Sequence, residues 1–168
     1  MATDGKNLSL FDRHNLPDGA HFRVGIVVSE WNEPITTALL HGALEVFASA
    51  GVPDDHLVIQ RVPGAFELPL AAQWLFEHEG TDGVLVVGSV IRGETPHFDF
   101  VCNACAQGVM QVGLKAGKPV VFCVLTDENW DQARDRSGGK HGNKGIECAV
   151  ACLQMMDARR VLTTSATA

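Results

Sequence analysis

The fold is decided by the stretch Gly83-Val-Leu-Val-Val-Gly-Ser-Val-Ile-Arg-Gly-Glu-Thr-Pro-His97, in which an apolar strand turns into a helix. Gly83 to Gly88 is apolar enough to lie in the centre of a sheet, and a helical pattern runs from Pro96 to Ala116. The same alternation continues on both sides. Further strands are expected at residues 22–28, 57–62 and 119–125. One further helix should run from residue 34 to a break at 51–53, and three others are expected at 67–79, 129–136 and 145–160.

Strands rich in Val and Ile that alternate with amphipathic helices indicate βαβ units and a parallel sheet covered on both faces. The expected fold class is α/β, a three-layer α/β/α sandwich of flavodoxin-like type with a four-stranded parallel sheet. Residues 21–162 are expected to form its single domain, between an N-terminal extension at 1–20 and a flexible tail at 163–168. A short sheet leaves an exposed edge, which the N-terminal strand of a neighbouring chain could extend.

Length and composition exclude several functional classes. The chain has 168 residues, 46% of them hydrophobic, which is enough for a substantial core. Its net charge of −7 argues against nucleic acid or an anionic membrane as the main partner. No segment has the length and apolarity of a membrane span, and residues 1–12 lack the order of a signal peptide, so a cytoplasmic protein is expected.

Five cysteines raise the question of a metal or disulfide site. Cys102 and Cys105 form a C-x-x-C pair, and Cys148 and Cys152 are one helical turn apart. Both pairs fall in apolar helical patterns without a second pair at zinc-finger spacing. We therefore expect small hydrophobic side chains and no structural metal.

The turn before the helix at Pro96 has the features of an anion site beside a base. Thr95 is a suitable N-cap and Pro96 a suitable first helical residue, so backbone amides around Gly93, Glu94 and Thr95 should face outward, where phosphate binds well. His97 would lie in the first turn, where the helix dipole disfavours imidazolium and leaves a ring able to accept a proton. Alone, such a histidine is more often an ordinary surface residue.

Other unusual residues fall where parallel strands end, which is where ligands bind in such sheets. Trp31, with Asn32, follows the first strand and could either fill the core or stack on a flat heterocycle. Glu67 could be a solvated helix-start acid or an acceptor for a sugar hydroxyl or a ring NH. The Gly-rich loop 134–145 fails the P-loop spacing and is expected to be a solvated turn, but its cations could complete an anion site: Arg136, Lys140 and Lys144.

Five separated motifs together resemble the lumazine synthase family, over roughly residues 22–160. The motifs are Trp31-Asn32, Pro63-Gly-Ala-Phe-Glu67, Gly88-Ser-Val-Ile-Arg-Gly-Glu-Thr-Pro-His-Phe-Asp-Phe-Val101, Thr126-Asp-Glu-Asn129 and Gly142-Asn-Lys-Gly145.

This resemblance implies a riboflavin-pathway transferase that needs no cofactor and no metal. It would condense 5-amino-6-(D-ribitylamino)uracil with 3,4-dihydroxy-2-butanone 4-phosphate to 6,7-dimethyl-8-ribityllumazine, releasing phosphate and water. By position, His97 would be the proton shuttle. The ring and the ribityl chain would be held by Trp31, Asn32, Ala65, Phe66, Glu67, Ser89, Val90 and Ile91. The phosphate would be held by Gly93, Glu94, Thr95 and Arg136.

By the same likeness, an adjacent subunit would contribute Phe122, Arg136, Lys144 and Glu147. The resemblance thus implies a homo-oligomer built from pentamers with shared active sites, and it names riboflavin synthase as a candidate partner. Pentamer, decamer and sixty-subunit shell all stay open.

Two rival functions are compatible with parts of this pattern. A noncatalytic flavin- or lumazine-binding module, or a shell subunit for another enzyme, would use the same stacking residue but has no need for Arg136 beside a base. A phosphosugar lyase on a similar sheet would leave Trp31 and Glu67 without a role.

Overall fold

A four-stranded parallel sheet forms the middle layer of the computed structural model, which describes residue 7 and residues 9–165. The strands are β1 (Val24–Ser29), β2 (Leu57–Val62), β3 (Gly83–Ile91) and β4 (Val120–Asp127), in the order β2-β1-β3-β4. The helices are α1 (Glu33–Ser49), α2 (Leu68–His78), α3 (His97–Ala116), α4 (Trp130–Arg136) and α5 (Lys144–Ser165). The predicted fold class is confirmed.

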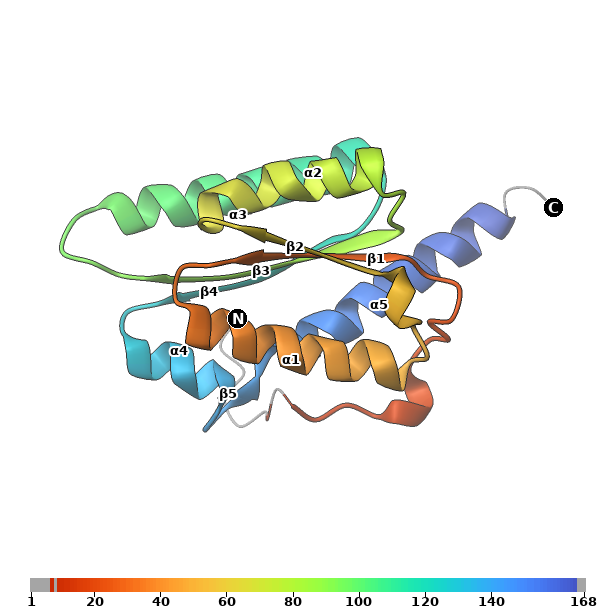
Figure 1. Ribbon diagram of the computed structural model, residues 1–168, viewed down its shortest axis with the longest axis horizontal. Helices are drawn as coiled ribbons and strands as arrows, with labels where there is room; N and C mark the ends of the chain where they lie inside the picture. The colour runs from red at the N-terminus through yellow and green to blue at the C-terminus, as the bar shows by residue number, and fades with distance from the viewer. Residues whose placement is uncertain (1–6, 8, 166–168) are drawn as a thin grey trace.

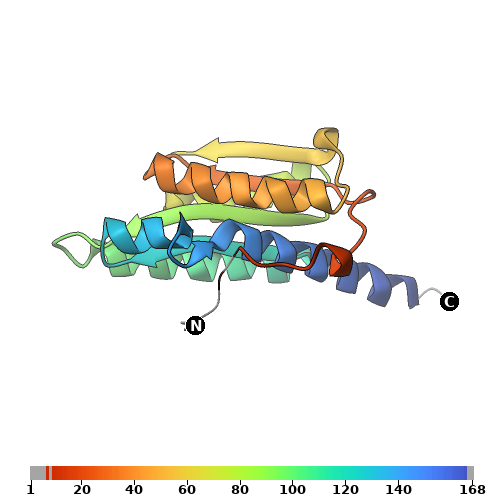
Figure 2. The same ribbon diagram turned by 90° about the horizontal axis from the view of Figure 1, so that it is seen from below.

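The helices lie in two layers (Figure 1). α2 and α3 cover one face of the sheet, and α1, α4 and α5 cover the other. Figure 2, seen from below, shows α1 and α5 running side by side in front of the strands. β1 and β3 are therefore buried on both faces, which explains why their sequences are almost uninterrupted runs of Val, Ile and Leu.

Two separate cores fill the spaces between these layers. In β3, Leu85 and Val87 point to the core shared with α1 and α5, whereas Val84 and Val86 point to the core shared with α2 and α3. This is the alternation of side chains along a strand. Each face of the sheet therefore packs on its own layer of helices through its own core.

Several boundaries differ from those expected. β3 continues three residues past Gly88 because its register with β4 extends from Val84↔Val120 to Ile91↔Asp127. Loop 134–145 is not a simple turn. It contains a short antiparallel hairpin of β5 (Ser137–Gly139) and β6 (Gly142–Asn143). α5 continues to Ser165, so residues 163–165 are helical rather than part of a tail, and residues 166–168 lie outside the described residues.

The described part of the N-terminal extension lies along its own chain. Phe11 and Leu16 pack against the core beside α1, and the Ser9 hydroxyl accepts a hydrogen bond from the backbone N–H of Asn143 at 2.9 Å. Within residue 7 and residues 9–20, the regular structure is one 3-10 turn at Arg13–Asn15. Residues 1–6 and 8 lie outside the described residues.

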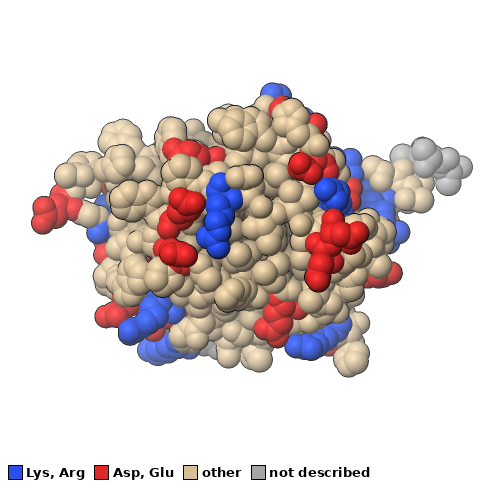
Figure 3. All heavy atoms as spheres, viewed as in Figure 1, with Lys and Arg blue, Asp and Glu red and all other residues tan. Residues whose placement is uncertain are grey.

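In the described part of the chain, no helix is long and apolar enough to cross a membrane. On the face drawn in Figure 3, acidic and basic side chains are interspersed rather than gathered by sign.

Candidate functional site

The carboxyl edge of the sheet, where β1 to β4 all end, gathers unsatisfied polar groups. Ser29 at the end of β1, Ser89 in β3 and Asp127 at the end of β4 each have a buried side-chain oxygen without a hydrogen-bond partner among the described residues. Native structures rarely leave such atoms unpaired unless a ligand, water or function accounts for them. The carboxyl edge is also where the sequence places its candidate site residues.

The ends of β1, β2 and β3 are tied together by hydrogen bonds from the residues after β1. The backbone N–H of Glu30 donates to the Val62 carbonyl at 2.9 Å, and that of Trp31 donates to the Pro63 carbonyl at 3.3 Å. The Asn32 side-chain amide donates to the carbonyl of Ser89 at 3.0 Å. Asn32 adopts a left-handed backbone conformation with φ of 58°, which asparagine tolerates better than most residues. Asn32 therefore bridges β1 and β3.

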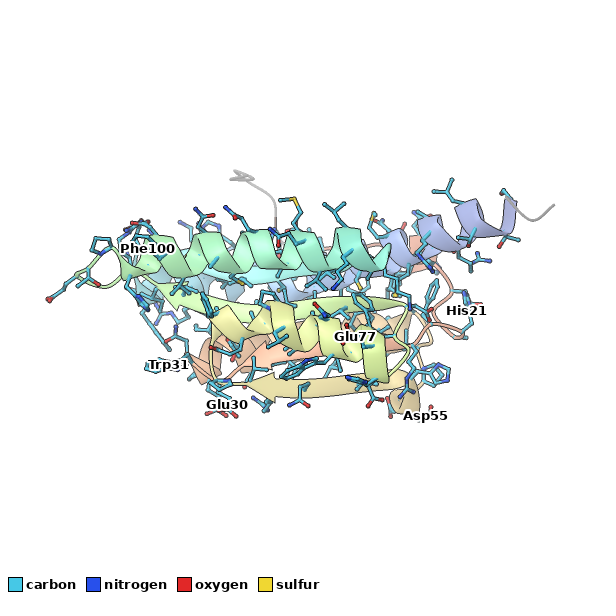
Figure 4. The ribbon with its side chains drawn as sticks, turned by 90° about the horizontal axis from the view of Figure 1, so that it is seen from above. His21, Glu30, Trp31, Asp55, Glu77 and Phe100 are labelled. Atoms are coloured by element: carbon cyan, nitrogen blue, oxygen red, sulfur yellow. The ribbon has the colours of Figure 1, made fainter. Side chains whose placement is uncertain are left out.

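Trp31 does not fill the core. Its side chain is 73% exposed, at the same end of the molecule as Phe100 and at the opposite end from Asp55 and His21 (Figure 4). A Cβ placed on Gly64 would lie 3.6 Å from Trp31 Cδ1 and 3.1 Å from Glu67 Oε2. The bare backbone of Gly64 thus lies between the indole and the carboxylate. An exposed flat ring beside an acceptor suits a heterocycle that carries NH or OH groups.

The rest of the β2–α2 segment forms a 3-10 turn, Ala65–Glu67 (η3), which leads into α2. Ala65 is buried, while Phe66 and Glu67 are exposed, with Phe66 at 63%. Val90 and Ile91 at the end of β3 are half-buried beside the buried Ser89. These residues and Trp31 line one continuous part of the edge, formed by β2, β1 and β3.

The start of α3 differs from its predicted form. Pro96, not Thr95, is the N-cap residue, and it has no side-chain cap hydrogen bond, so the prediction of Thr95 as N-cap is wrong. The reason is that the loop turns one residue later, with the Asp99 N–H bonding to the Pro96 carbonyl at 3.0 Å. His97 becomes the first helical residue and is exposed. Amides of the first turn consequently lack a side-chain acceptor and can receive an anion.

A cluster of ion pairs at this edge was not anticipated from the sequence. Arg92 pairs with Asp99 and with Glu128, at 2.9 Å in each case. These contacts raise the pKa of the Arg92 guanidinium and lower that of Asp99. The pairing joins residues 36 positions apart in the chain, for which no local sequence pattern exists.

Arg136 lies at the end of α4 and is held more loosely. Its Nη1 is 3.5 Å from Asp127 Oδ1 and donates to the Gln132 carbonyl at 3.0 Å. Burial raises the pKa of Asp127, and the nearby charge of Arg136 opposes that shift. Lys140, the third cation of the loop, is exposed in the β5–β6 turn.

Lys144 and Glu147 lie in α5, close to Phe122 of β4. Lys144 Nζ pairs with Glu147 Oε1 at 2.9 Å in the first turn of α5. That turn is anchored by Asn143, whose side chain accepts from the Gly145 N–H and donates to the Ala38 carbonyl, both at 2.8 Å. The following Cys148 thiol contacts the carbonyl of Phe122 at 3.9 Å, which places Phe122 beside this turn.

Within one chain, the predicted site residues fall on different strands of the sheet. Trp31, Glu67 and His97 follow β1, β2 and β3, whereas Phe122, Arg136 and Lys144 are associated with β4 at the other edge. Neighbouring strands are about 4.8 Å apart, so the outer strands β2 and β4 are separated by about 14 Å. The five cysteines are free thiols, and the described residues contain no group of three or more His, Cys, Asp or Glu side chains placed to hold a metal ion.

Comparison with known proteins gives a consistent result. The sequence model of the family described as 6,7-dimethyl-8-ribityllumazine synthase matches residues 21–160. The chain is 47% identical to the 6,7-dimethyl-8-ribityllumazine synthase of Flavobacterium johnsoniae, over 98% of this chain and 87% of that protein. It is 48% identical to the one of Christiangramia forsetii, over 95% and 96%, and 50% identical to the one of Cytophaga hutchinsonii, over 93% and 98%.

Proposed function

The chain belongs to the 6,7-dimethyl-8-ribityllumazine synthase family, and we propose that it carries out the family's reaction at the carboxyl edge of its sheet, with His97 as the proton-transfer group. The reaction condenses 5-amino-6-(D-ribitylamino)uracil with 3,4-dihydroxy-2-butanone 4-phosphate, and it yields 6,7-dimethyl-8-ribityllumazine, phosphate and water. It is the penultimate step of riboflavin biosynthesis.

The observation that carries this assignment of the site is the exposed His97 as the first residue of α3, next to the exposed loop 92–96 and without a side-chain cap at Pro96. A phosphate bound to the amides of Gly93, Glu94 and Thr95 would contact residues that immediately precede His97 in the chain. Arg136 would supply the second half of that phosphate site, since it has a single carboxylate partner, at 3.5 Å.

The pyrimidine and its ribityl chain would lie across β1, β2 and β3. Trp31 offers an exposed indole for stacking, and Glu67 offers an acceptor for ribityl hydroxyls on the other side of Gly64. The other residues that would line this part of the substrate site are Asn32, Ala65, Phe66, Ser89, Val90 and Ile91. The unpartnered buried hydroxyl of Ser89 is consistent with a polar ligand at this place.

The chemistry needs proton transfer and orientation rather than a metal. The amine of the uracil attacks the ketone and forms an imine, phosphate leaves by elimination, and the ring then closes. Proton transfer by His97 would contribute about 10²–10⁴-fold to the rate. Holding the amine and the ketone together supplies further acceleration, because effective molarities in well-oriented pairs reach on the order of 10⁵ M.

We also propose that a second copy of the chain completes the site, as part of a homo-oligomer built from pentamers. Phe122, Arg136, Lys144 and Glu147 belong to the β4 side and would approach the neighbour's Trp31, Glu67 and His97. A contact between two different edges is heterologous, and repetition of such a contact forms a ring when its rotation closes.

Two apolar surfaces support this contact. A groove of about 1020 Å³ runs between α3 and α5 along β4, with Phe122 in its lining, and Met110, Leu114, Met155 and Leu162 in it are each more than half exposed. On the β2 side, Phe66, Leu70 and Trp74 are exposed by 63%, 51% and 50%. Exposed apolar surface on this scale is typical of protein interfaces.

A further partner and a cellular location can also be proposed. We propose riboflavin synthase as a further partner on the family resemblance alone. We propose a cytoplasmic location because the five cysteines are free thiols, as is usual in reducing compartments.

The direct test of the proposed site is to mix the purified protein with both substrates and follow the absorbance of the lumazine product. The parent protein should form it, and His97→Ala should form it about 10²-fold or more slowly while binding the substrates normally. A single-turnover rate for His97→Ala equal to that of the parent would remove His97 from the mechanism. A protein that binds lumazine but forms none would instead be the noncatalytic binder.

A further inference from the structure

The loop that presents His97 is not fixed by packing. Residues 92–96 between β3 and α3 are all exposed, and a Cβ placed on Gly93 would have no atom within 4 Å. The N-cap residue Pro96 provides no side-chain cap. A catalytic group directly after such a loop needs another support, because small misplacements of a reacting group strongly reduce the rate.

Arg92 supplies that support through its guanidinium. Nη2 and Nη1 contact the two carboxylate oxygens of Asp99 at 2.9 and 3.2 Å, which is a bidentate pair. Nε contacts Oε2 of Glu128 at 2.9 Å. The guanidinium carbon also lies 4.1 Å from the centre of the Phe98 ring, within the range of a cation–π contact.

These contacts join three elements at one residue. Arg92 follows β3, Phe98 and Asp99 belong to the first turn of α3, and Glu128 follows β4. The backbone N–H of Arg92 also donates to the carbonyl of Asp127 at 3.0 Å. Phe98 is only 9% exposed, so the residue directly after His97 is fixed both by the core and by Arg92.

Arg92 is badly placed to be a phosphate ligand. Its planar fork is already occupied by two carboxylates, so the cluster of Arg92, Asp99 and Glu128 carries a net negative charge. Arg136, by contrast, has one carboxylate partner, at 3.5 Å. A dianionic phosphate is attracted to Arg136 and repelled by the cluster around Arg92.

We propose that Arg92 is a positioning residue, which holds the first turn of α3 against the end of β4 and so fixes the imidazole of His97 relative to the bound substrates. The inference rests on the proposed role of His97. Lysine cannot replace Arg92 in this role, because an ammonium group lacks the planar fork that binds Asp99 and Glu128 together.

The test compares Arg92→Lys with a matched control, Arg13→Lys. Arg13 likewise combines an ion pair, with Glu45 at 3.1 Å, and a cation–π contact, with Phe11 at 5.7 Å, but it has a single carboxylate partner and lies in the N-terminal segment. We expect Arg92→Lys to lower kcat by about tenfold with the KM of each substrate within about twofold of the parent value, and Arg13→Lys to change neither. Hydrogen–deuterium exchange at residues 92–101 should become faster in Arg92→Lys alone.

Two combinations show whether Arg92 acts through His97. In a His97→Ala background, Arg92→Lys should cause no further loss of rate, because there is no imidazole left to position. Asp99→Asn should lower kcat to a similar extent, and the double variant with Arg92→Lys should be no slower than either single variant. Independent, multiplying losses in the His97→Ala background would overturn the inference.

Failure of the premise can be told apart from failure of the inference. If His97→Ala keeps the parental rate, the proposed role of His97 is wrong. Two results with a slow His97→Ala would leave the role of His97 intact and show that the positioning role of Arg92 is wrong. In the first, Arg92→Lys keeps the parental kcat. In the second, Arg92→Lys chiefly raises the KM of the phosphorylated substrate.

Discussion

Replacement of Asn32 tests how the carboxyl edge is held in shape. Asn32 has a left-handed backbone with φ of 58°, and its side chain donates to the Ser89 carbonyl at 3.0 Å. Asn32→Ala removes the hydrogen bond and also places alanine, which disfavours the left-handed conformation, at a position that requires it. Asn32→Gly removes the hydrogen bond but suits the backbone. The two variants therefore separate the side-chain contribution from the backbone contribution.

The expected magnitudes follow from these two terms. Loss of one hydrogen bond costs about 1 kcal/mol. The left-handed conformation costs an ordinary L-residue about 1 kcal/mol more than glycine. We expect Asn32→Gly to lower the free energy of unfolding by about 1 kcal/mol and Asn32→Ala by about 2 kcal/mol. For a chain of this size these values correspond to a Tm lowered by about 3 and 6 °C.

The measurement is urea unfolding followed by tryptophan fluorescence, at one protein concentration because in the proposed oligomer subunit dissociation would be linked to unfolding. Asn32→Asp is the third variant, since aspartate also tolerates the left-handed region but places a carboxylate against the Ser89 carbonyl; it should be no more stable than Asn32→Gly. Equal stabilities of Asn32→Ala and Asn32→Gly would refute the backbone argument. Parental stability of Asn32→Gly would refute the contribution of the bridge to Ser89.

Three further predictions concern charge and titration. Arg136→Ala should raise the KM of the phosphorylated butanone by about 10- to 100-fold, since charged hydrogen bonds contribute about 1.5–3 kcal/mol; an equal rise in the KM of the uracil substrate, in steady-state kinetics, would contradict a phosphate-specific role. Burial raises the pKa of Asp127, so the folded chain holds that proton more tightly than the unfolded chain, and the stability this contributes is present at low pH and lost as pH rises through the folded pKa. Asp127→Asn should therefore raise Tm above that of the parent at pH 8 and leave it unchanged at pH 4. An increase of equal size at both pH values would show that titration is not the cause. Four thiols are buried, those of Cys105, Cys123, Cys148 and Cys152, and burial raises the pKa of Cys105 and of Cys152 to about 12. A thiol-titrating reagent at pH 8 should therefore react rapidly with at most Cys102 in the native protein and with all five thiols in denaturant; rapid native labelling of Cys105 or Cys152, detected by peptide mass spectrometry, would contradict their burial.

The layer architecture could be predicted because it depends on local pattern. Runs such as Gly83 to Gly88 are apolar at consecutive positions, which a strand buried on both faces requires, and the breaks between elements carry Gly and Pro. The β5–β6 hairpin was missed because Ser137–Gly139 has no apolar alternation; it depends on docking beside α1 and α4.

The places of the candidate site residues after the strands could be predicted, but the partners of their neighbours could not. Strand ends identify Trp31, Glu67 and His97 as neighbours at one edge, because parallel strands end together. The pairing of Arg92 with Glu128 depends on β3 and β4 being adjacent, which the sequence of either strand does not specify. Thr95 was expected to cap α3 because it precedes Pro96, yet the hydrogen bond from Asp99 to Pro96 places the cap one residue later.

The central claim, that one chain's His97 works with a neighbour's Arg136, can be tested by subunit complementation. His97→Ala and Arg136→Ala would be dissociated, mixed in equal amounts and reassembled, with each variant reassembled alone as the control. If the site is shared, about one quarter of the sites in random mixed oligomers combine an intact His97 from one chain with an intact Arg136 from the next. With the phosphorylated substrate below the parental KM, where Arg136→Ala is expected to be slow, the mixture should therefore recover about one quarter of the parental activity. Activity of the mixture no higher than the mean of the two variants alone would contradict a shared site.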